Sequence, residues 1–312
     1  MFKEQNFQIK NRKIRELYIN EKRKEPERFL RRLDLSWSIW MFGIEPFENS
    51  LGRLKRNGLN FVEVKGDTSI KVDEIKNALK KYEMEVSGAC GLFPTDRDLS
   101  SNDREIRENA VNYLKDLTEY VSLIGGKYIV IVPSAVGRNT ALDSEEFSRS
   151  VQALKSCSKY FASNKVAAAI EPIRSAEVSL IHTVDDALKY INAINDSAIS
   201  HINGDIYHML NEESHIGEAI LKCAEKLINL HIADSNRDAP GKGMIDIDVV
   251  IMAAYIVGMN QPGRFLTFEP LGPYPDPYVL STQKCMVDIM DNLVKESVSY
   301  FREREEFVRS LE

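Results

Sequence analysis

The sequence predicts a single (β/α)8 TIM barrel preceded by an extra N-terminal helical segment, and two observations support this prediction. Strand-like apolar runs alternate with segments of helical periodicity between Leu33 and Phe301, and eight such units fit into this span. Four of these runs, in successive units, end in a residue that can bind a divalent cation. Because the carboxyl ends of barrel strands converge on one mouth, these residues also predict where an active site lies.

The composition is that of a globular protein with no nucleic-acid or membrane footprint. The 312 residues, of which 43% are hydrophobic, suffice for one large barrel domain. A net charge of −6 gives no general attraction to nucleic acid, and no apolar run is long enough for a transmembrane helix. The four cysteines are far apart and unpaired in sequence, so we expect reduced thiols in a soluble, cytoplasmic protein.

Residues 1–32 form a predicted basic extension ahead of a single catalytic domain that spans residues 33–312. The extension holds eleven Lys or Arg against five Glu. Ile14, Leu17 and Tyr18 fall at helical spacing, so we expect a helix that packs on the barrel or on a partner subunit. A basic arm for nucleic acid has little support, because acidic residues are interspersed through the segment.

The first half of the barrel is predicted from four strand–helix units. Alternating residues mark the first strand, and the second strand places Glu63 on one face. Asp103 is a candidate N-cap for the long third helix, which ends at the glycine pair Gly125 and Gly126. The expected strands are Leu33–Ile39, Phe61–Lys65, Glu85–Ala89 and Lys127–Val132, and the expected helices are Glu45–Asn57, Val72–Tyr82, Arg104–Leu123 and Glu145–Ser163.

The second half repeats the pattern and carries the polar strand ends. Asp246 is a candidate cap for the third helix of this half, and we expect a polar loop between Asp205 and Ile216. A charged tail is expected after Phe301. The expected strands are Val166–Ile170, Ser200–Gly204, Leu227–Leu230 and Arg264–Phe268, and the expected helices are Val184–Ile194, Ile216–Lys226, Ile247–Val257 and residues 279–301.

The four strand ends of this half place three carboxylates and one imidazole at the predicted mouth. Glu171, Asp205, His231 and Glu269 are separated by 34, 26 and 38 residues, about one strand-plus-helix unit each time. Such a mixed oxygen and nitrogen set suits Mn²⁺, Co²⁺ or Mg²⁺. Any one of them alone reads best as an ordinary polar residue at a barrel rim. Four in successive units favour a metal site.

Finer spacing around these residues carries a family resemblance. Glu177 lies six residues after the first strand end, His208 lies three after the second, and Arg237 lies six after the third. This pattern resembles the ketose 3-epimerases, the D-tagatose and D-psicose 3-epimerase group of the xylose-isomerase-like sugar isomerase/epimerase barrels. The resemblance covers most of the chain from Leu33 to Phe301 and is strongest in the four strands that end in the predicted ligands.

The resemblance implies a site and a reaction. It implies one divalent metal ion, Mn²⁺ in the first place, bound by Glu171, Asp205, His231 and Glu269, and substrate contacts at Glu177, His208 and Arg237. It further implies epimerisation at carbon 3 of a free ketose. These residue types are consistent with that chemistry, because two glutamates on opposite sides of a sugar can remove and return a proton through a metal-stabilised enediolate. We expect a small-molecule sugar substrate and a homo-oligomer.

Departures from the family pattern keep a second enzyme class open. Arg174-Ser175-Ala176 stands where the family commonly has an Asn-Arg-aromatic run, and a proline-rich segment follows Glu269. C-glycoside deglycosidases, lyases that cleave 3-oxo glycosides, share this barrel and work with a small second subunit. Trp37 and Trp40 at the first strand end suit an apolar wall beside a substrate, although aromatic core is an equal interpretation.

Three further interpretations are weaker. Endonuclease IV has a related metal barrel, but its trinuclear zinc site needs more histidines than the two that fall in this constellation. A non-catalytic binding barrel would not need the complete set of site residues. Gly241-Lys242-Gly243 could cradle a phosphate through backbone N–H groups, but such glycine pairs are common in loops. Among the other histidines, His182 and His215 are expected at helix starts and His201 in the core.

Overall fold

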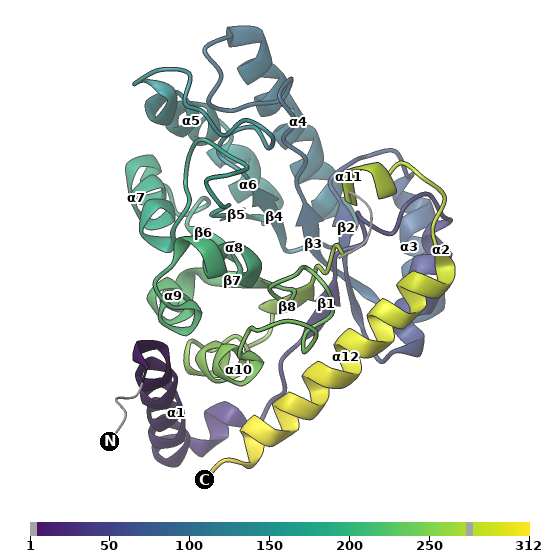
Figure 1. The fold of residues 1–312 in the computed structure, drawn as a ribbon. Helices are drawn as coiled ribbons and strands as arrows, with labels where there is room; N and C mark the ends of the chain where they lie inside the picture. Colours follow the sequence, from purple (N-terminus) through teal and green to yellow (C-terminus); the bar gives the residue numbers. More distant parts are fainter. Residues whose placement is uncertain (1–4, 273–276) are drawn as a thin grey trace.

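A computed structural model of the chain describes residues 5–272 and 277–312, and these form the predicted barrel (Figure 1). The strands of one parallel eight-stranded sheet follow the order β1-β8-β7-β6-β5-β4-β3-β2. The ring closes where Ile39 N donates to Glu63 O at 3.1 Å, beside a bridge between Ser38 and Glu63. The strands are β1 (Leu35–Trp37), β2 (Phe61–Lys65), β3 (Glu85–Cys90), β4 (Tyr128–Ile131), β5 (Ala167–Ile170), β6 (His201–Asp205), β7 (Leu227–Ile232) and β8 (Phe265–Phe268).

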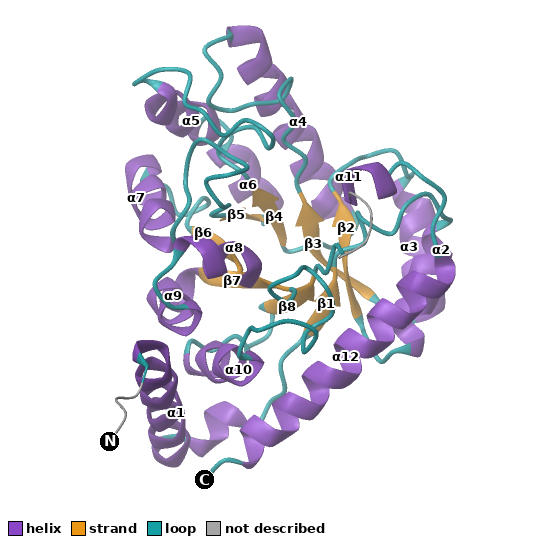
Figure 2. Cartoon of the chain, viewed as in Figure 1, coloured by secondary structure: helices purple, strands orange, loops and turns teal. Residues whose placement is uncertain are grey.

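Helices surround the sheet on its outer side, as the colouring by secondary structure shows (Figure 2). Asp103 and Asp246 cap α4 and α10 as predicted, each accepting a backbone N–H of the first turn. The helices are α1 (Asn6–Lys24), α2 (Phe47–Arg56), α3 (Val72–Tyr82), α4 (Arg104–Leu123), α5 (Glu146–Lys155), α6 (Ser158–Asn164), α7 (Val184–Ile194), α8 (Ile206–Glu212), α9 (Ile216–Cys223), α10 (Ile247–Ile256), α11 (Pro277–Leu280) and α12 (Val287–Ser310), with 3₁₀ turns at Pro26–Phe29 and Ala224–Lys226.

Four predicted elements differ from the structure. The expected last helix, residues 279–301, is divided, because α11 ends at Leu280 and α12 begins at Val287. The expected helix Glu145–Ser163 is two helices, α5 and α6. The expected polar loop after Asp205 is instead α8, because the Asp205 carboxylate accepts the Tyr207 backbone N–H at 2.7 Å and starts a helix there. The expected charged tail is the last part of α12, which buries Glu305 and Val308. Part of the proline-rich segment that follows Glu269 lies outside the described residues.

The N-terminal extension packs on the barrel, one of the two positions expected for it. Its helix α1 runs beside α9 and α10 (Figure 1) and buries Ile14 and Tyr18. The Tyr18 ring packs edge-on against Phe29 and Tyr255, at centroid distances of 5.4 and 6.1 Å. Lys10 adds an ion pair to Glu218 at 2.6 Å. The apolar contacts therefore fix α1 to the outer helical layer.

We expect Tyr18→Ala to lower the free energy of unfolding by about 3 kcal/mol, because it empties a fully buried aromatic site. Urea denaturation measures the change. Phe7→Ala on the same helix is the matched control, since the Phe7 side chain is 57% exposed and its loss should cost no more than about 0.5 kcal/mol. Equal losses in the two variants would contradict the docking of α1 through Tyr18.

The barrel interior is apolar near the amino ends of the strands and polar toward their carboxyl ends. Tyr128, Phe265 and Ala169 belong to a separate interior cluster, with Phe61 packed against it. Gly88 makes room for the Tyr128 ring, because a Cβ at this position would lie 2.5 Å from it. Above this cluster lie hydrogen-bonded polar side chains from six strands, namely Ser36, Glu63, Ser87, Asn203, Asn229 and Thr267. The polar side chains lie next to the strand ends that carry the predicted ligands.

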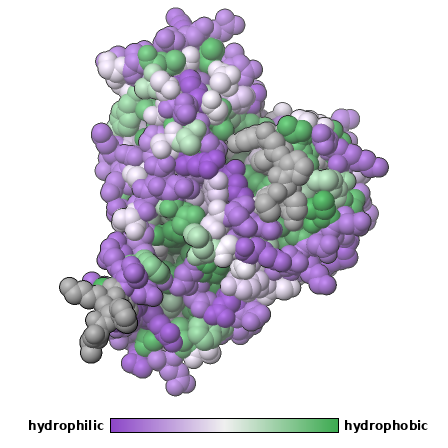
Figure 3. Space-filling view, viewed as in Figure 1, coloured by the Kyte–Doolittle hydropathy of each residue, from purple (hydrophilic) through white to green (hydrophobic). Residues whose placement is uncertain are grey.

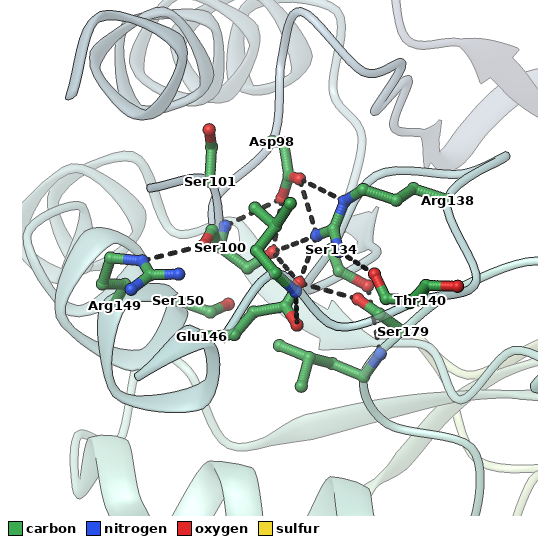
Figure 4. A network of polar contacts seen from close by, with 12 residues as sticks. Asp98, Ser100, Ser101, Ser134, Arg138, Thr140, Glu146, Arg149, Ser150 and Ser179 are labelled. Carbon is green, nitrogen blue, oxygen red and sulfur yellow. Dashed lines mark hydrogen bonds and ion pairs between the residues drawn. The ribbon is translucent and has the colours of Figure 1, made fainter. Parts of the chain in front are cut away.

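A buried polar network holds the loops that follow β3, β4 and β5 (Figure 4). Arg138 donates to Asp98 Oδ2 at 2.8 Å and also pairs with Glu146. The Glu146 carboxylate accepts from Ser100 at 3.0 Å and from Ser179 at 2.8 Å. Three loops at the mouth are thereby tied together. The loop from 171 to 183, which carries the predicted substrate contact Glu177, is one of them.

The hydrophilic surface and the free cysteines agree with what the composition predicts. Figure 3 shows a largely hydrophilic face with smaller hydrophobic areas. In the described part of the chain, no helix combines the length and the apolar character that crossing a membrane requires. All four cysteines are free, as expected for reduced thiols.

Candidate active site

The parallel strands bring the four predicted ligands to the same end of the barrel. Glu171 and Glu269 directly follow β5 and β8, while Asp205 and His231 lie at the ends of β6 and β7 and are register partners. Their exposed fractions are 5%, 8%, 4% and 1%. Four ionisable side chains are therefore held almost out of water at the mouth.

His231 lies at the centre of this group. Its Nδ1 is 3.2 Å from Glu171 Oε1 and 3.3 Å from Glu269 Oε2. Asp205, His231 and Glu269 offer ligand atoms within 4.8 Å of one another, as do Glu171, Asp205 and His208. Donor atoms about 2.1 Å from an octahedral cation lie about 3 Å apart, so the spacing fits a divalent metal ion.

The electrostatics of the group also fit a cation. Burial alone would lower the pKa of His231, but the carboxylates of Glu269 and Glu63 raise it well above its ordinary value. Burial raises the pKa of Glu171, whereas the charge of His231 and hydrogen bonds from His231 and Trp40 overcome burial and lower the pKa of Glu269 to about 2. The His231 imidazolium thus balances several carboxylates, and a bound metal ion would take over that role with release of the Nδ1 proton.

Polar residues two positions before the ligands form a network that the sequence analysis missed. Asn203 Nδ2 donates to Glu171 Oε1 at 2.8 Å and lies 3.2 Å from His231 Nδ1. Asn229 donates to Asn203 Oδ1 at 2.8 Å, and Thr267 donates to Asn229 Oδ1 at 2.7 Å. The signal was present in the sequence, because residues i and i+2 of a strand face the same side.

Arg237 stands beside the acidic group. Burial lowers its pKa, but the charges of Asp205, Glu177 and Glu269 raise it above the ordinary value. Its guanidinium lies 4.3 Å from the centroid of the Tyr207 ring. Its backbone has a positive φ of 62°, which non-glycine residues rarely adopt. Such local strain is typical of residues held in place for function.

The other two predicted substrate contacts lie at the same mouth. His208 is buried, with Nε2 at 3.4 Å from Asp205 Oδ2, and its Nδ1 has no hydrogen-bond partner. Glu177 pairs with Arg174, whose guanidinium also donates to the Tyr207 hydroxyl at 2.7 Å. A buried nitrogen without a partner is available for a substrate hydroxyl.

The two tryptophans have different environments. Trp40 donates its indole N–H to Glu269 Oε1 at 2.6 Å and so reaches the candidate site. Trp37 is fully buried and packs with Phe42 and Phe268 at centroid distances of 5.8 and 5.5 Å. Because side chains alternate along β1 and Ser36 faces the interior, Trp37 points to the outer helices. The interpretation of Trp37 as a substrate contact is therefore corrected to aromatic core.

The segment Gly241-Lys242-Gly243 is not a phosphate cradle. The Asp234 carboxylate accepts the backbone N–H of Gly241 at 2.7 Å and that of Ile245 at 3.1 Å. Lys242 pairs with Glu296 at 3.2 Å. An internal carboxylate thus occupies the position where an anion would bind.

A family model and several relatives match this sequence. The model of the xylose isomerase-like TIM barrel matches residues 51–270 of the chain. The chain belongs to this family. The chain is 30% identical over 241 residues to the 3-dehydro-D-guloside 4-epimerase of Escherichia coli (strain K12), covering 72% of this chain and 89% of that protein.

Two further comparisons concern ribulose epimerases. The chain is 26% identical over 228 residues to the L-ribulose 3-epimerase of Mesorhizobium japonicum, covering 71% of this chain and 75% of that protein. A solved structure of L-ribulose 3-epimerase superimposes with a TM-score of 0.78 at 20% identity, covering 89% of this chain and 96% of that one. These relatives are named as epimerases, so they give no support to the alternative of a carbon–carbon lyase.

Proposed function

We propose that this protein is a metal-dependent sugar epimerase that inverts a carbon next to a ketone, in the first place carbon 3 of a free ketose. One observation carries the proposal. Two buried glutamates, Glu171 and Glu269, lie within 3.2 and 3.3 Å of the same His231 nitrogen, and they come from strands separated by β6 and β7. A pair of carboxylates placed around one cation position suits proton removal on one side of a sugar and proton return on the other.

Four residues would bind the metal, and two of them would also transfer the proton. Glu171, Asp205, His231 and Glu269 would hold one divalent cation, with Mn²⁺ the metal we propose. When bound, it would supply Lewis-acid polarisation of the ketone. One glutamate takes the proton from the carbon next to the ketone, leaving an enediolate, and the other glutamate, already protonated, donates to the opposite face. The turnover is redox-neutral and only exchanges the protonation states of the two glutamates.

Positioning would come from the residues around the metal. Arg237 carries a permanent positive charge beside the carboxylates, which suits a bond to a sugar oxygen that gains negative charge. His208 offers the Nδ1 that has no partner within the protein. Glu177, on the loop held by the network of Figure 4, would bind a substrate hydroxyl. These contacts hold the reacting carbon between the two glutamates.

A second candidate reaction is 4-epimerisation of a 3-oxo glycoside. It is favoured by the 30% identity to the E. coli 3-dehydro-D-guloside 4-epimerase. The chemistry would be the same, because carbon 4 of such a sugar is also next to a ketone. A cavity of about 290 Å³ beside Trp40, lined by Ile39, Ile44 and Phe47 among others, offers space for the group that a glycoside carries and a free ketose lacks.

A substrate panel tests the proposal and separates its two forms. Purified Mn²⁺-loaded protein is incubated with free pentuloses and hexuloses and, separately, with 3-oxo glycosides, and the products are identified by chromatography and NMR. Inversion at carbon 3 of a free ketose supports the first form. Inversion only at carbon 4 of 3-oxo glycosides would instead show that the protein is a 4-epimerase of 3-oxo glycosides. The absence of inversion in both groups would contradict the epimerase proposal.

Trp40→Phe is expected to lower kcat/KM about 10- to 100-fold. The variant keeps an aromatic ring but removes the N–H that Glu269 accepts, and a hydrogen bond to a charged group contributes about 1.5–3 kcal/mol. Steady-state kinetics on the substrate found in the panel measure the effect.

Trp37→Phe is the matched control for this prediction. The Trp37 N–H is buried without a partner, so its removal should leave kcat/KM unchanged. A loss in Trp37→Phe as large as that in Trp40→Phe would show that ring size, rather than the bond to Glu269, matters.

A further inference from the structure

Glu63 is a buried carboxylate to which the proposed reaction assigns no role. It lies in the middle of β2 and is fully buried. Among the residues that the structure describes, its one ion-pairing partner is His231. A carboxylate in the interior of a barrel is costly unless it is hydrogen-bonded. The hydrogen bonds of Glu63 therefore show how its carboxylate is stabilised inside the barrel.

Three side chains form hydrogen bonds with the Glu63 carboxylate. Both carboxylate oxygens lie 3.2 Å from His231 Nε2. Oε2 also accepts the Tyr128 hydroxyl at 2.7 Å and the Asn229 amide N–H at 3.3 Å. The Tyr128 hydroxyl and the Asn229 amide donate to this carboxylate, and His231 Nε2 lies where an N–H would donate to it as well.

The hydrogen bonds continue from Glu63 through Asn229 and Asn203 to the proposed metal ligands. With its N–H directed to Glu63, Asn229 also donates to Asn203 Oδ1 at 2.8 Å. Asn203 then has its amide N–H free to donate to Glu171 Oε1 at 2.8 Å. The imidazole of His231, donating from Nε2, keeps Nδ1 for the side where Glu171 and Glu269 lie.

We propose that Glu63 is a positioning residue that sets the direction of hydrogen bonding behind the metal site. It holds His231 in the form that donates from Nε2 and offers Nδ1 to the cation. Through Asn229 and Asn203 it also fixes the carboxylate of Glu171. This inference rests on the metal site of the proposed function. Outer partners of metal-binding histidines commonly change metal affinity about 10- to 100-fold when they are replaced.

The test measures metal binding without substrate. We expect Glu63→Gln to raise the Kd for Mn²⁺ about 10- to 100-fold in isothermal titration calorimetry, because the glutamine amide can donate and reverse the network. Glu305→Gln is the matched control. Glu305 is equally buried and accepts the Leu33 N–H and the Tyr255 hydroxyl, but it lies on α12, away from the strands that carry the ligands. Its Kd should equal that of the wild type.

A second measurement shows which nitrogen of the His231 imidazole carries the proton. In ¹⁵N NMR of the Zn²⁺-loaded protein, His231 should carry its proton on Nε2, and Glu63→Gln should weaken or shift this signal. Tyr128→Phe, which removes one hydrogen bond to Glu63 and keeps the carboxylate in place, provides a second variant if Glu63→Gln does not fold, and its Kd should also rise. The same Kd in wild type and both Glu63→Gln and Tyr128→Phe would overturn this inference alone. A wild type that binds no Mn²⁺ would overturn both this inference and the proposed metal site.

Discussion

Glu171→Gln and Glu269→Gln are each expected to lower the rate of epimerisation about 10²- to 10⁴-fold, the usual contribution of a general acid or base. Each substitution is nearly isosteric and keeps an oxygen that can bind a metal, but an amide cannot take a proton from carbon. The rate of inversion, measured by chromatography in both directions, should fall in both variants.

Hydrogen exchange should distinguish the two variants. The glutamate that remains can still remove a proton from the epimer that presents it on that side and return it to the same face. Each variant should therefore exchange deuterium into one epimer without inverting it, and the two variants should prefer opposite epimers. Exchange into the same epimer by both would contradict the assignment of one glutamate to each face. Mn²⁺ titration of each variant controls for loss of the metal.

Removal of the metal is expected to lower kcat/KM by about three orders of magnitude, since a Lewis acid contributes several kcal/mol to stabilising the developing charge. Dialysis against a chelator and re-addition of Mn²⁺, Co²⁺ or Mg²⁺ measure the loss and its recovery. We expect Mn²⁺ to restore the highest rate.

The same experiment has a readout that needs no substrate. The metal-free site holds Glu171, Asp205 and Glu269 in a small buried space, so a cation that binds only the folded chain should stabilise it. At a free metal concentration of 100 times Kd, the gain is about 2.7 kcal/mol. Melting curves with and without Mn²⁺ measure it. A chelated protein with full activity and an unchanged melting temperature would contradict metal dependence.

Much of the fold could be predicted from the sequence because the barrel repeats one unit. The strand Phe61–Lys65 and the helices Val72–Tyr82, Arg104–Leu123 and Val184–Ile194 have their predicted bounds. Short apolar strands separated by amphipathic helices leave few alternatives. The convergence of Glu171, Asp205, His231 and Glu269 also follows from this repeat, since every strand of a parallel barrel ends at the same mouth.

The remaining differences come from contacts that the local pattern does not contain. Helix α8 was expected as a loop because its start depends on the Asp205 carboxylate, which the sequence analysis assigned to the metal alone. The sequence left Trp37 open between a wall beside the substrate and aromatic core, because the strand is only three residues long and its phase is ambiguous. Glu63 was seen to face one side of its strand. Its partner His231, however, lies 168 residues away, and only the closed barrel brings the two together.

The most direct test of the account is deuterium incorporation in D₂O. Mn²⁺-loaded protein is mixed with the ketose or 3-oxo glycoside that it accepts, and the carbon next to the ketone is followed by NMR. We predict that deuterium enters at this carbon as the epimer forms, and that Glu269→Gln slows formation of the epimer by about 10²-fold or more. An epimer that forms without deuterium at this carbon, in a wild type whose glutamates exchange with solvent, would contradict proton transfer by Glu171 and Glu269.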